Sequence, residues 1–101
     1  MTTHKIPLFK TSITEVDKDY AREQTGCPFI DDLDGMSFVD KSGCLCVWFD
    51  GEPDLDTIVH ESVHLANMII DRTGMMYTTK EDELLDYFVS YIFNELRGKD
   101  D

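Results

Sequence analysis

The chain is short of positive charge, of cysteine and of long apolar runs. Its 101 residues include 9 Lys and Arg against 21 Asp and Glu, a formal net charge of −12. Such a surface repels nucleic-acid phosphates and anionic membranes, so we expect neither as a partner. No apolar run is long enough to cross a bilayer, and residues 1–7 lack the apolar core of a secretion signal. The three cysteines, an odd set without such a signal, predict a protein of the reducing cytoplasm.

No internal repeat, linker or low-complexity tract divides the chain. Its 42% hydrophobic and 30% charged residues are typical of a soluble globular protein. A chain of this length suffices for one small core. We therefore expect a single domain over residues 1–101.

The N-terminal half has the pattern of a small sheet. The run from Ile6 to Val16, rich in Thr and Ile, predicts a first strand, and the helix formers from Asp17 to Thr25, closed by Gly26, predict a short helix. Residues 36–40 and 44–49 flank a turn of hairpin length.

Two segments of this half are open to more than one interpretation. Cys44 and Cys46 are two residues apart on the most strand-like segment, so their side chains are expected on the same face of the strand. We expect them to be small core residues; the alternative is a metal-binding or redox-active pair. The acidic run from Asp31 to Asp34 is expected to be a solvated loop, with a calcium site as the alternative.

Two long helices follow. Asp54 can cap a helix from Leu55 to about Thr73, and a second begins near Thr79 and ends at about Arg97. Apolar residues recur at helical spacing in both: Leu55, Ile58, Val59, Val63, Ala66, Ile69 and Ile70 in the first, and Leu84, Leu85, Phe88, Ile92, Phe93 and Leu96 in the second. This order predicts an α+β domain with a short helix and two long C-terminal helices on one face of a small antiparallel sheet.

The first long helix contains an HExxH motif, His60-Glu61-Ser62-Val63-His64. Residues four apart lie on the same face of a helix, so His60 and His64 can bind one zinc ion together. Glu61 lies beside that ion and can act as a general base toward a water molecule.

A catalytic zinc site normally has three protein ligands, so the motif needs one more. Eighteen residues separate His64 from Glu83, which lies near the start of the second long helix beside its apolar stripe. We expect Glu83 to be the third ligand. Glu81 and Asp82 are the alternatives on other faces of that helix.

The sequence here resembles a known family. HESVH, followed by Glu83 within EDELLDYFVSYI, is similar to the gluzincin class of zinc metallopeptidases. In overall layout the chain also resembles the small metallopeptidases that tailed bacteriophages encode. The resemblance implies one zinc ion per chain bound by His60, His64 and Glu83, Glu61 as the general base, and a peptide or protein substrate.

The chain departs from the family pattern around the third ligand. An acidic residue, Asp86, replaces the small residue that usually precedes the tyrosine, so it is either a hydrogen-bond acceptor for a ligand imidazole or a solvated carboxylate. Full-sized gluzincins have a second lobe with a donor for the oxyanion, and this chain has no room for one. Tyr87 is the expected substitute, with Tyr77 and His4 as alternatives.

Three hypotheses on partners follow from these features. A peptide substrate could pair along the strand Cys44–Phe49 if that strand is the edge of the sheet over the zinc. Alternatively, the protein is a non-catalytic acidic protein with a structural zinc that binds or inhibits a basic host protein in the host cytoplasm. A helical interaction module without a metal is the third.

Overall fold

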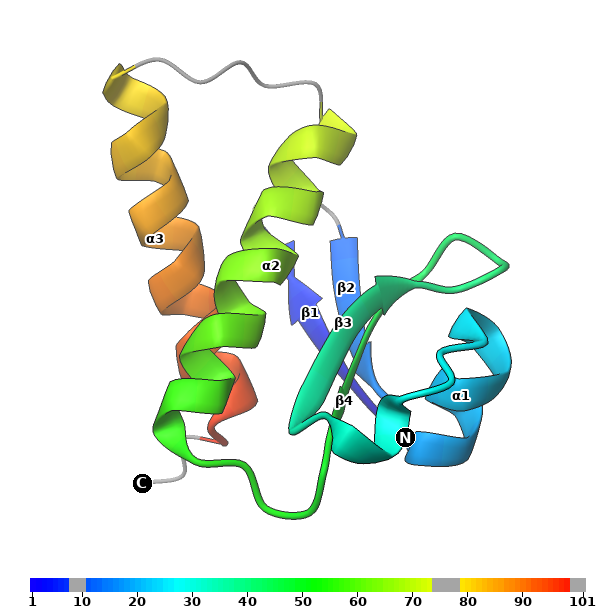
Figure 1. Ribbon diagram of the computed structural model, residues 1–101. Coiled ribbons are helices and arrows are strands. Elements are labelled where there is room, and N and C mark those ends of the chain that lie inside the picture. The colour runs from blue at the N-terminus through cyan, green and yellow to red at the C-terminus, as the bar shows by residue number, and fades with distance from the viewer. Residues whose placement is uncertain (8–10, 74–78, 99–101) are drawn as a thin grey trace.

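The computed structural model describes residues 1–7, 11–73 and 79–98, and for Thr73 and residues 79–84 the backbone alone. Figure 1 shows the arrangement of the elements. They are β1 (Thr2–Ile6), β2 (Thr11–Glu15), α1 (Lys18–Thr25), a 3₁₀ turn (Ile30–Asp32), β3 (Gly35–Val39), β4 (Leu45–Phe49), α2 (Leu55–Thr73) and α3 (Thr79–Leu96). The predicted α+β class is therefore confirmed.

The four strands form one mixed sheet in the order β1-β2-β4-β3. β1 pairs with β2 and β3 with β4 in antiparallel fashion, whereas β2 and β4 are parallel, with Ile13 opposite Leu45. The prediction of an antiparallel sheet was wrong at this pair. Parallel neighbours need a long crossover, and the chain supplies it by passing through α1 and β3 between them.

The N-terminal region forms two strands, of which the sequence predicts one. β2 lies within the predicted run from Ile6 to Val16, whereas β1 precedes that run except for Ile6 and was not expected. The two strands pair with each other, with Thr2 opposite Glu15 and Ile6 opposite Thr11. The Thr- and Ile-rich composition identifies extended chain correctly, but composition alone does not locate a reversal.

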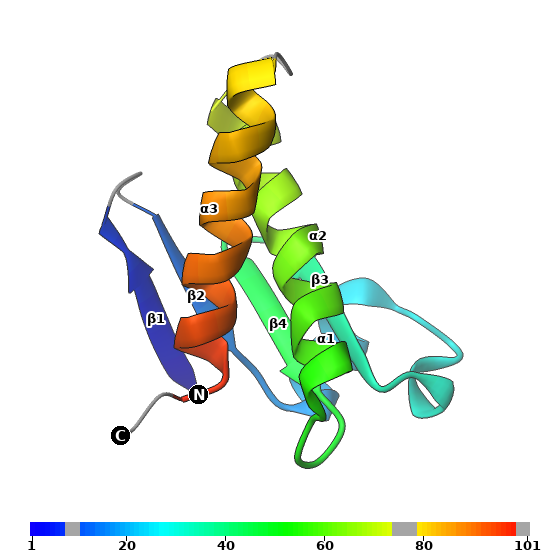
Figure 2. The same ribbon diagram turned by 90° about the vertical axis from the view of Figure 1, so that its left-hand side faces the viewer.

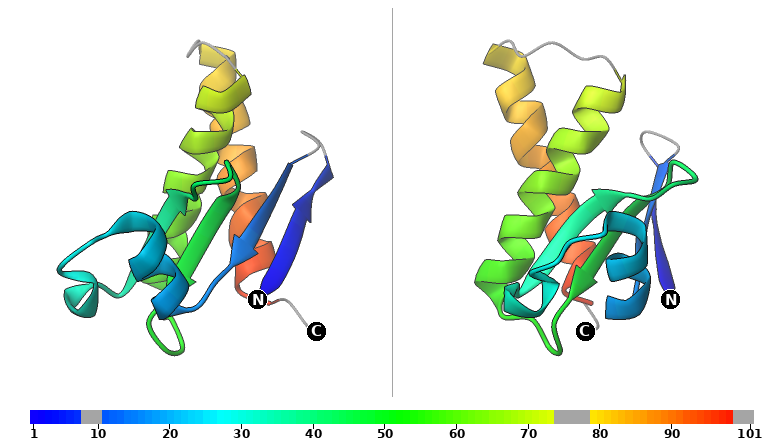
Figure 3. Two further views of the ribbon diagram at one scale, coloured as in Figure 1. Left: turned by 90° about the vertical axis from the view of Figure 1, so that its right-hand side faces the viewer. Right: turned by 45° about the vertical axis from the view of Figure 1, so that its right-hand side comes forward.

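The helices cover both faces of the sheet, so the prediction of one covered face was wrong for α1. α2 lies along β3, α3 lies toward β1, and the two helices run antiparallel side by side (Figure 2). α1 lies across the opposite face (Figure 3). Along β4, Leu45 and Val47 point to the α2–α3 side, while Cys46 and Trp48 point to the α1 side. This alternation divides the apolar residues between two cores.

The larger core lies between the sheet and the helices α2 and α3. Its buried members are Ile6, Ile13, Leu45, Val47, Ile58, Leu65, Ala66, Ile69, Ile70, Phe88, Ile92 and Leu96. Three apolar residues that follow the helical spacing of α2, Leu55, Val59 and Val63, are instead exposed. In the part of the chain that the structure describes, no helix is long and apolar enough to span a membrane.

α1 ends at Gly26 as predicted, and Asp17, expected as the first residue of the helix, is its cap. The Asp17 carboxylate accepts a hydrogen bond from the Tyr20 N–H at 2.8 Å, and Gly26 closes the helix in the left-handed conformation with φ of 65°. A side chain at that φ would be strained, which is why glycine ends the helix there.

Asp40 ties α1 to the β3–β4 turn. Its carboxylate accepts hydrogen bonds from Tyr20 Oη at 2.7 Å, from Ser42 Oγ at 2.7 Å and from the Cys44 N–H at 2.9 Å. These bonds, that of Tyr20 first, hold the pKa of Asp40 far below its usual range. The same Tyr20–Asp40 bond raises the pKa of Tyr20 to about 12.

Cys44 and Cys46 are free thiols with different surroundings. Cys46 is a buried core residue, as predicted, and burial, followed by the nearby Asp40 charge, raises its pKa to about 12. Cys44 is exposed next to the turn, so its prediction as a core residue was wrong.

Candidate metal centre

Helix α2 is fixed at its start and along one side. Asp54 caps it, because its carboxylate accepts a hydrogen bond from the Thr57 N–H at 2.8 Å. Ile58, Leu65 and Ile69 then bury one side of the helix in the larger core. The remaining side is left facing solvent, and it carries His60 and His64.

The two histidines converge at their Nε2 atoms. The Nε2 atoms of His60 and His64 lie 3.0 Å apart, and the rings meet edge to face at an angle of 81°. Two nitrogen ligands on a tetrahedral zinc ion, each at about 2.0–2.1 Å from it, are separated by about 3.3 Å. The observed separation is close to that value, so this pair fits two ligands of one zinc ion.

Glu61 points away from the solvent, toward β3. Its side chain is only 4% exposed, and its Oε1 accepts a hydrogen bond from Ser37 Oγ at 2.6 Å. The Ser37 hydroxyl is also 3.4 Å from the Glu61 backbone carbonyl oxygen. Among the residues that the structure describes, no other group bonds the Glu61 carboxylate, so its second oxygen, Oε2, is free to accept a proton.

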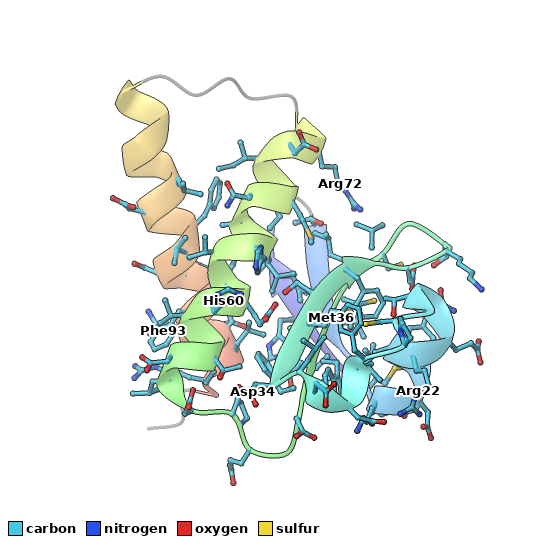
Figure 4. The ribbon with its side chains drawn as sticks, in the orientation of Figure 1. Arg22, Asp34, Met36, His60, Arg72 and Phe93 are labelled. Carbon is cyan, nitrogen blue, oxygen red and sulfur yellow. The ribbon has the colours of Figure 1, made fainter. Side chains whose placement is uncertain are left out.

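A cavity of about 400 Å³ opens beside this carboxylate. Figure 4 shows two of its residues, His60 on α2 and Asp34 on the segment that leads into β3. The lining residues come from the start of β3 and from the first two turns of α2 with its cap: Leu33, Asp34, Gly35, Asp54, Asp56, Thr57, His60 and Glu61. One predicted ligand and the predicted base therefore lie in the wall of the same cavity.

The strand Cys44–Phe49 cannot be the docking edge that the sequence suggested. β4 is central, and it pairs with β2 on one side and with β3 on the other. Its backbone groups between Leu45 and Val47 are consequently used on both sides. The edge next to α2 is β3, the strand that carries Ser37.

The predicted residues of the second long helix lie in α3, as expected. Glu83 is in its first half, and the side chains of Glu83, Glu81 and Asp82 lie outside the described residues, so the third ligand stays a prediction. Tyr87 is 55% exposed and its ring packs edge to face on Phe88 at 6.3 Å between centroids. Its role as oxyanion donor also stays a prediction.

Of the alternative oxyanion donors, His4 is excluded by its position in the sheet. His4 lies on β1, at the edge of the sheet opposite β3, three strand spacings or about 14 Å away. There its Nε2 is 2.7 Å from Glu15 Oε1 and its Nδ1 is 3.8 Å from Glu95 Oε1. His4 is therefore not part of the site, and Tyr77 lies outside the described residues.

Two residues of the site were not found from the sequence. Ser37 stands in a strand without a motif, and only the packing of β3 against α2 brings it to Glu61. Asp34 belongs to the run that the sequence predicts to be a solvated loop. Asp31 of that loop does form exposed ion pairs with Lys18 and Arg22, but Asp34 lines the cavity.

The described side chains contain no group of three His, Cys, Asp or Glu residues placed to hold a metal ion. The side chain of Glu83 is not among those described, so its place relative to the histidine pair stays a prediction. Comparisons of the chain with protein-family models, with curated proteins and with solved structures found no match.

Proposed function

We propose that this chain is a zinc-dependent hydrolase, and more specifically a metallopeptidase. The observation that carries the proposal is the convergence of the His60 and His64 Nε2 atoms at 3.0 Å, on the helix that also carries Glu61. The pair supplies two neutral nitrogen ligands, which zinc favours, on a face that solvent can reach. Glu83 is the proposed third ligand.

A zinc ion bound there would polarise a carbonyl group and lower the pKa of a water molecule. Glu61 is the proposed general base. The Ser37 hydroxyl holds one carboxylate oxygen at 2.6 Å, which fixes the orientation of the side chain and leaves Oε2 to take a proton and return it to a leaving amine. Tyr87 is the proposed donor to the developing oxyanion.

The peptide substrate is proposed to lie along β3. Because β3 is an edge strand beside α2, its outer side can pair with an extended peptide through backbone hydrogen bonds. Ser37 lies in the middle of this strand and contacts Glu61, so a peptide on that edge passes close to the base.

The test is the zinc content of the native protein, measured by mass spectrometry. We expect about one zinc per chain in the wild type and in His4→Ala, and none in His60→Ala or His64→Ala. His4→Ala is the matched control, since it removes the third histidine of the chain away from the site. Glu61→Gln should keep zinc and lose peptide hydrolysis.

Two results would contradict the proposal. Absence of zinc from the wild type, even after reconstitution, would remove the metal centre and leave a basic protein partner for the acidic surface as the better hypothesis. Retention of hydrolysis in Glu61→Gln would remove the proposed mechanism while leaving the metal site.

A further inference from the structure

The cavity beside Glu61 has an excess of negative charge. Four of its eight lining residues, Asp34, Asp54, Asp56 and Glu61, are acidic, and none is Lys or Arg. In the described part of the chain, the Lys and Arg ion pairs lie elsewhere, between α1 and Asp31 or within α1. Among the described side chains, the carboxylates of the cavity therefore have no ion pair with Lys or Arg.

Helix α2 offsets only part of this charge. Asp54 and Asp56 lie at the helix start, where the dipole contributes about half a positive charge. Asp54 also uses one oxygen on the Thr57 N–H. Asp34 and Glu61 lie outside the first turn, and Glu61, which is 4% exposed, contributes to the cavity wall. The net potential in the cavity is negative, and it favours a cation.

The size and the apolar part of the lining indicate which cation. A volume of about 400 Å³ is larger than a bare ion needs and lies in the range of small-molecule pockets. The uncharged lining residues Leu33, Gly35 and Thr57 lie between the carboxylates, and the Leu33 side chain is apolar. A long side chain with an aliphatic stem and a cationic head matches this combination.

We propose that this cavity is the specificity pocket of the enzyme and takes a lysine or arginine side chain of the peptide substrate. Asp34 and Asp56 are the residues that recognise the charged head. The pocket lies at the Gly35 end of β3, so a peptide on that edge would place one side chain over it. The identity of the bond that is cut rests on the proposed function, whereas binding of the side chain does not.

The test is a binding measurement on the full chain freed of metal by chelation, so that turnover plays no part. The probes are blocked pentapeptides, acetyl-Ala-Ala-X-Ala-Ala-amide, with X as lysine, arginine, norleucine or glutamate. Norleucine has the lysine stem without the charge. Binding is followed by NMR titration of isotope-labelled protein, in which the amides of Gly35 and Thr57 should shift.

We expect the lysine and arginine peptides to bind about tenfold more tightly than the norleucine peptide, because charge-assisted hydrogen bonds are worth more than neutral ones. The double variant Asp34→Asn, Asp56→Asn should reduce that preference to about twofold or less. The matched control is Asp71→Asn, which removes one charge from the exposed far end of α2 and should keep the preference. The amide spectrum of each variant shows that it is folded.

Several outcomes would overturn the pocket. They are equal binding of lysine and norleucine peptides, absence of binding, a preference that survives in the double variant, or an equal loss in Asp71→Asn, which would indicate net charge alone. Zinc content separates this inference from the proposed function. If the protein binds zinc but shows no preference for lysine, only the proposal of the specificity pocket is contradicted. If it prefers lysine but binds no zinc, the proposed peptidase is contradicted and a binding site for basic peptides remains.

Discussion

Replacing Ser37 by alanine tests whether β3 and α2 are joined through the Glu61 carboxylate. The variant removes the 2.6 Å hydrogen bond from Ser37 Oγ to Glu61 Oε1 and leaves that oxygen buried, since Glu61 is 4% exposed. A hydrogen bond to a charged group contributes about 1.5–3 kcal/mol, so we expect a loss of about 2 kcal/mol in the free energy of unfolding. For a domain of this size the loss corresponds to a fall in Tm of about 10 °C.

The assay is thermal and chemical unfolding of the wild type, Ser37→Ala and Ser37→Thr, with Ser90→Ala as control. Ser37→Thr keeps the hydroxyl and should recover most of the loss. Ser90 is exposed on α3, so its replacement should leave Tm nearly unchanged. In a Glu61→Gln background the bond is no longer charged, and Ser37→Ala should cost about half as much. A Tm for Ser37→Ala within about 2 °C of the wild type would show that the Ser37–Glu61 hydrogen bond does not stabilise the fold.

Three further predictions follow from particular contacts. Asp40→Asn should lower stability at neutral pH, measured by denaturant unfolding across pH. The pKa of Asp40 is depressed in the folded state, so its stabilisation is fully present above about pH 4 and declines as pH falls from there toward the lower folded pKa. The difference between wild type and variant should shrink over the same range, and a difference that does not change with pH would contradict this. Gly35→Ala would place a Cβ 3.0 Å from the Trp48 carbonyl oxygen and 3.2 Å from Phe49 Cδ1, so it should lower stability by about 1–3 kcal/mol in the same assay, and an unchanged midpoint would contradict it. Tyr87→Phe should keep zinc and Tm, because the side chain is 55% exposed, but should lower kcat about a hundredfold if Tyr87 stabilises the oxyanion; full activity would exclude that role.

The local elements of the fold were predictable from the sequence. Asp17 and Gly26 mark the ends of α1, and Asp54 marks the start of α2, because caps satisfy backbone groups that a helix leaves free at its ends. These signals act within a few residues. They do not depend on tertiary contacts, so the observed bounds of the helices agree closely with the expected ones.

The pairing of the strands was not predictable in the same way. β2 and β4 are far apart in the chain, and their parallel contact depends on where α1 crosses the sheet. The choice of β3 rather than β4 as the edge beside α2 follows from that pairing. Ser37 has no sequence signal of its own, because its function depends on a neighbour 24 positions away.

The exposure of the two histidines and the burial of Glu61, by contrast, are both determined by the sequence of α2 itself. Glu61 lies three residues after Ile58 and four before Leu65, both of which are buried, so it shares the phase of the core. His60 and His64 precede and follow it on the solvent side. The spacing of HExxH therefore places two exposed histidines and a buried glutamate on one helix, provided that the apolar side of the helix packs against the sheet.

A buried carboxylate without a cationic partner is costly, and Glu61 is bonded only by a neutral hydroxyl among the described residues. If the carboxylate is kept for catalysis rather than for stability, apolar replacement of the pair should not harm the fold. We expect the double variant Ser37→Ala, Glu61→Met to unfold at a Tm equal to or above that of the wild type, although Ser37→Ala alone is destabilising, because both polar partners leave together and the methionine fills the volume. The double variant should also bind zinc and hydrolyse nothing. A double variant that is less stable than Ser37→Ala alone would show that Glu61 stabilises the structure itself. Stability would then account for the buried carboxylate without a role as a base.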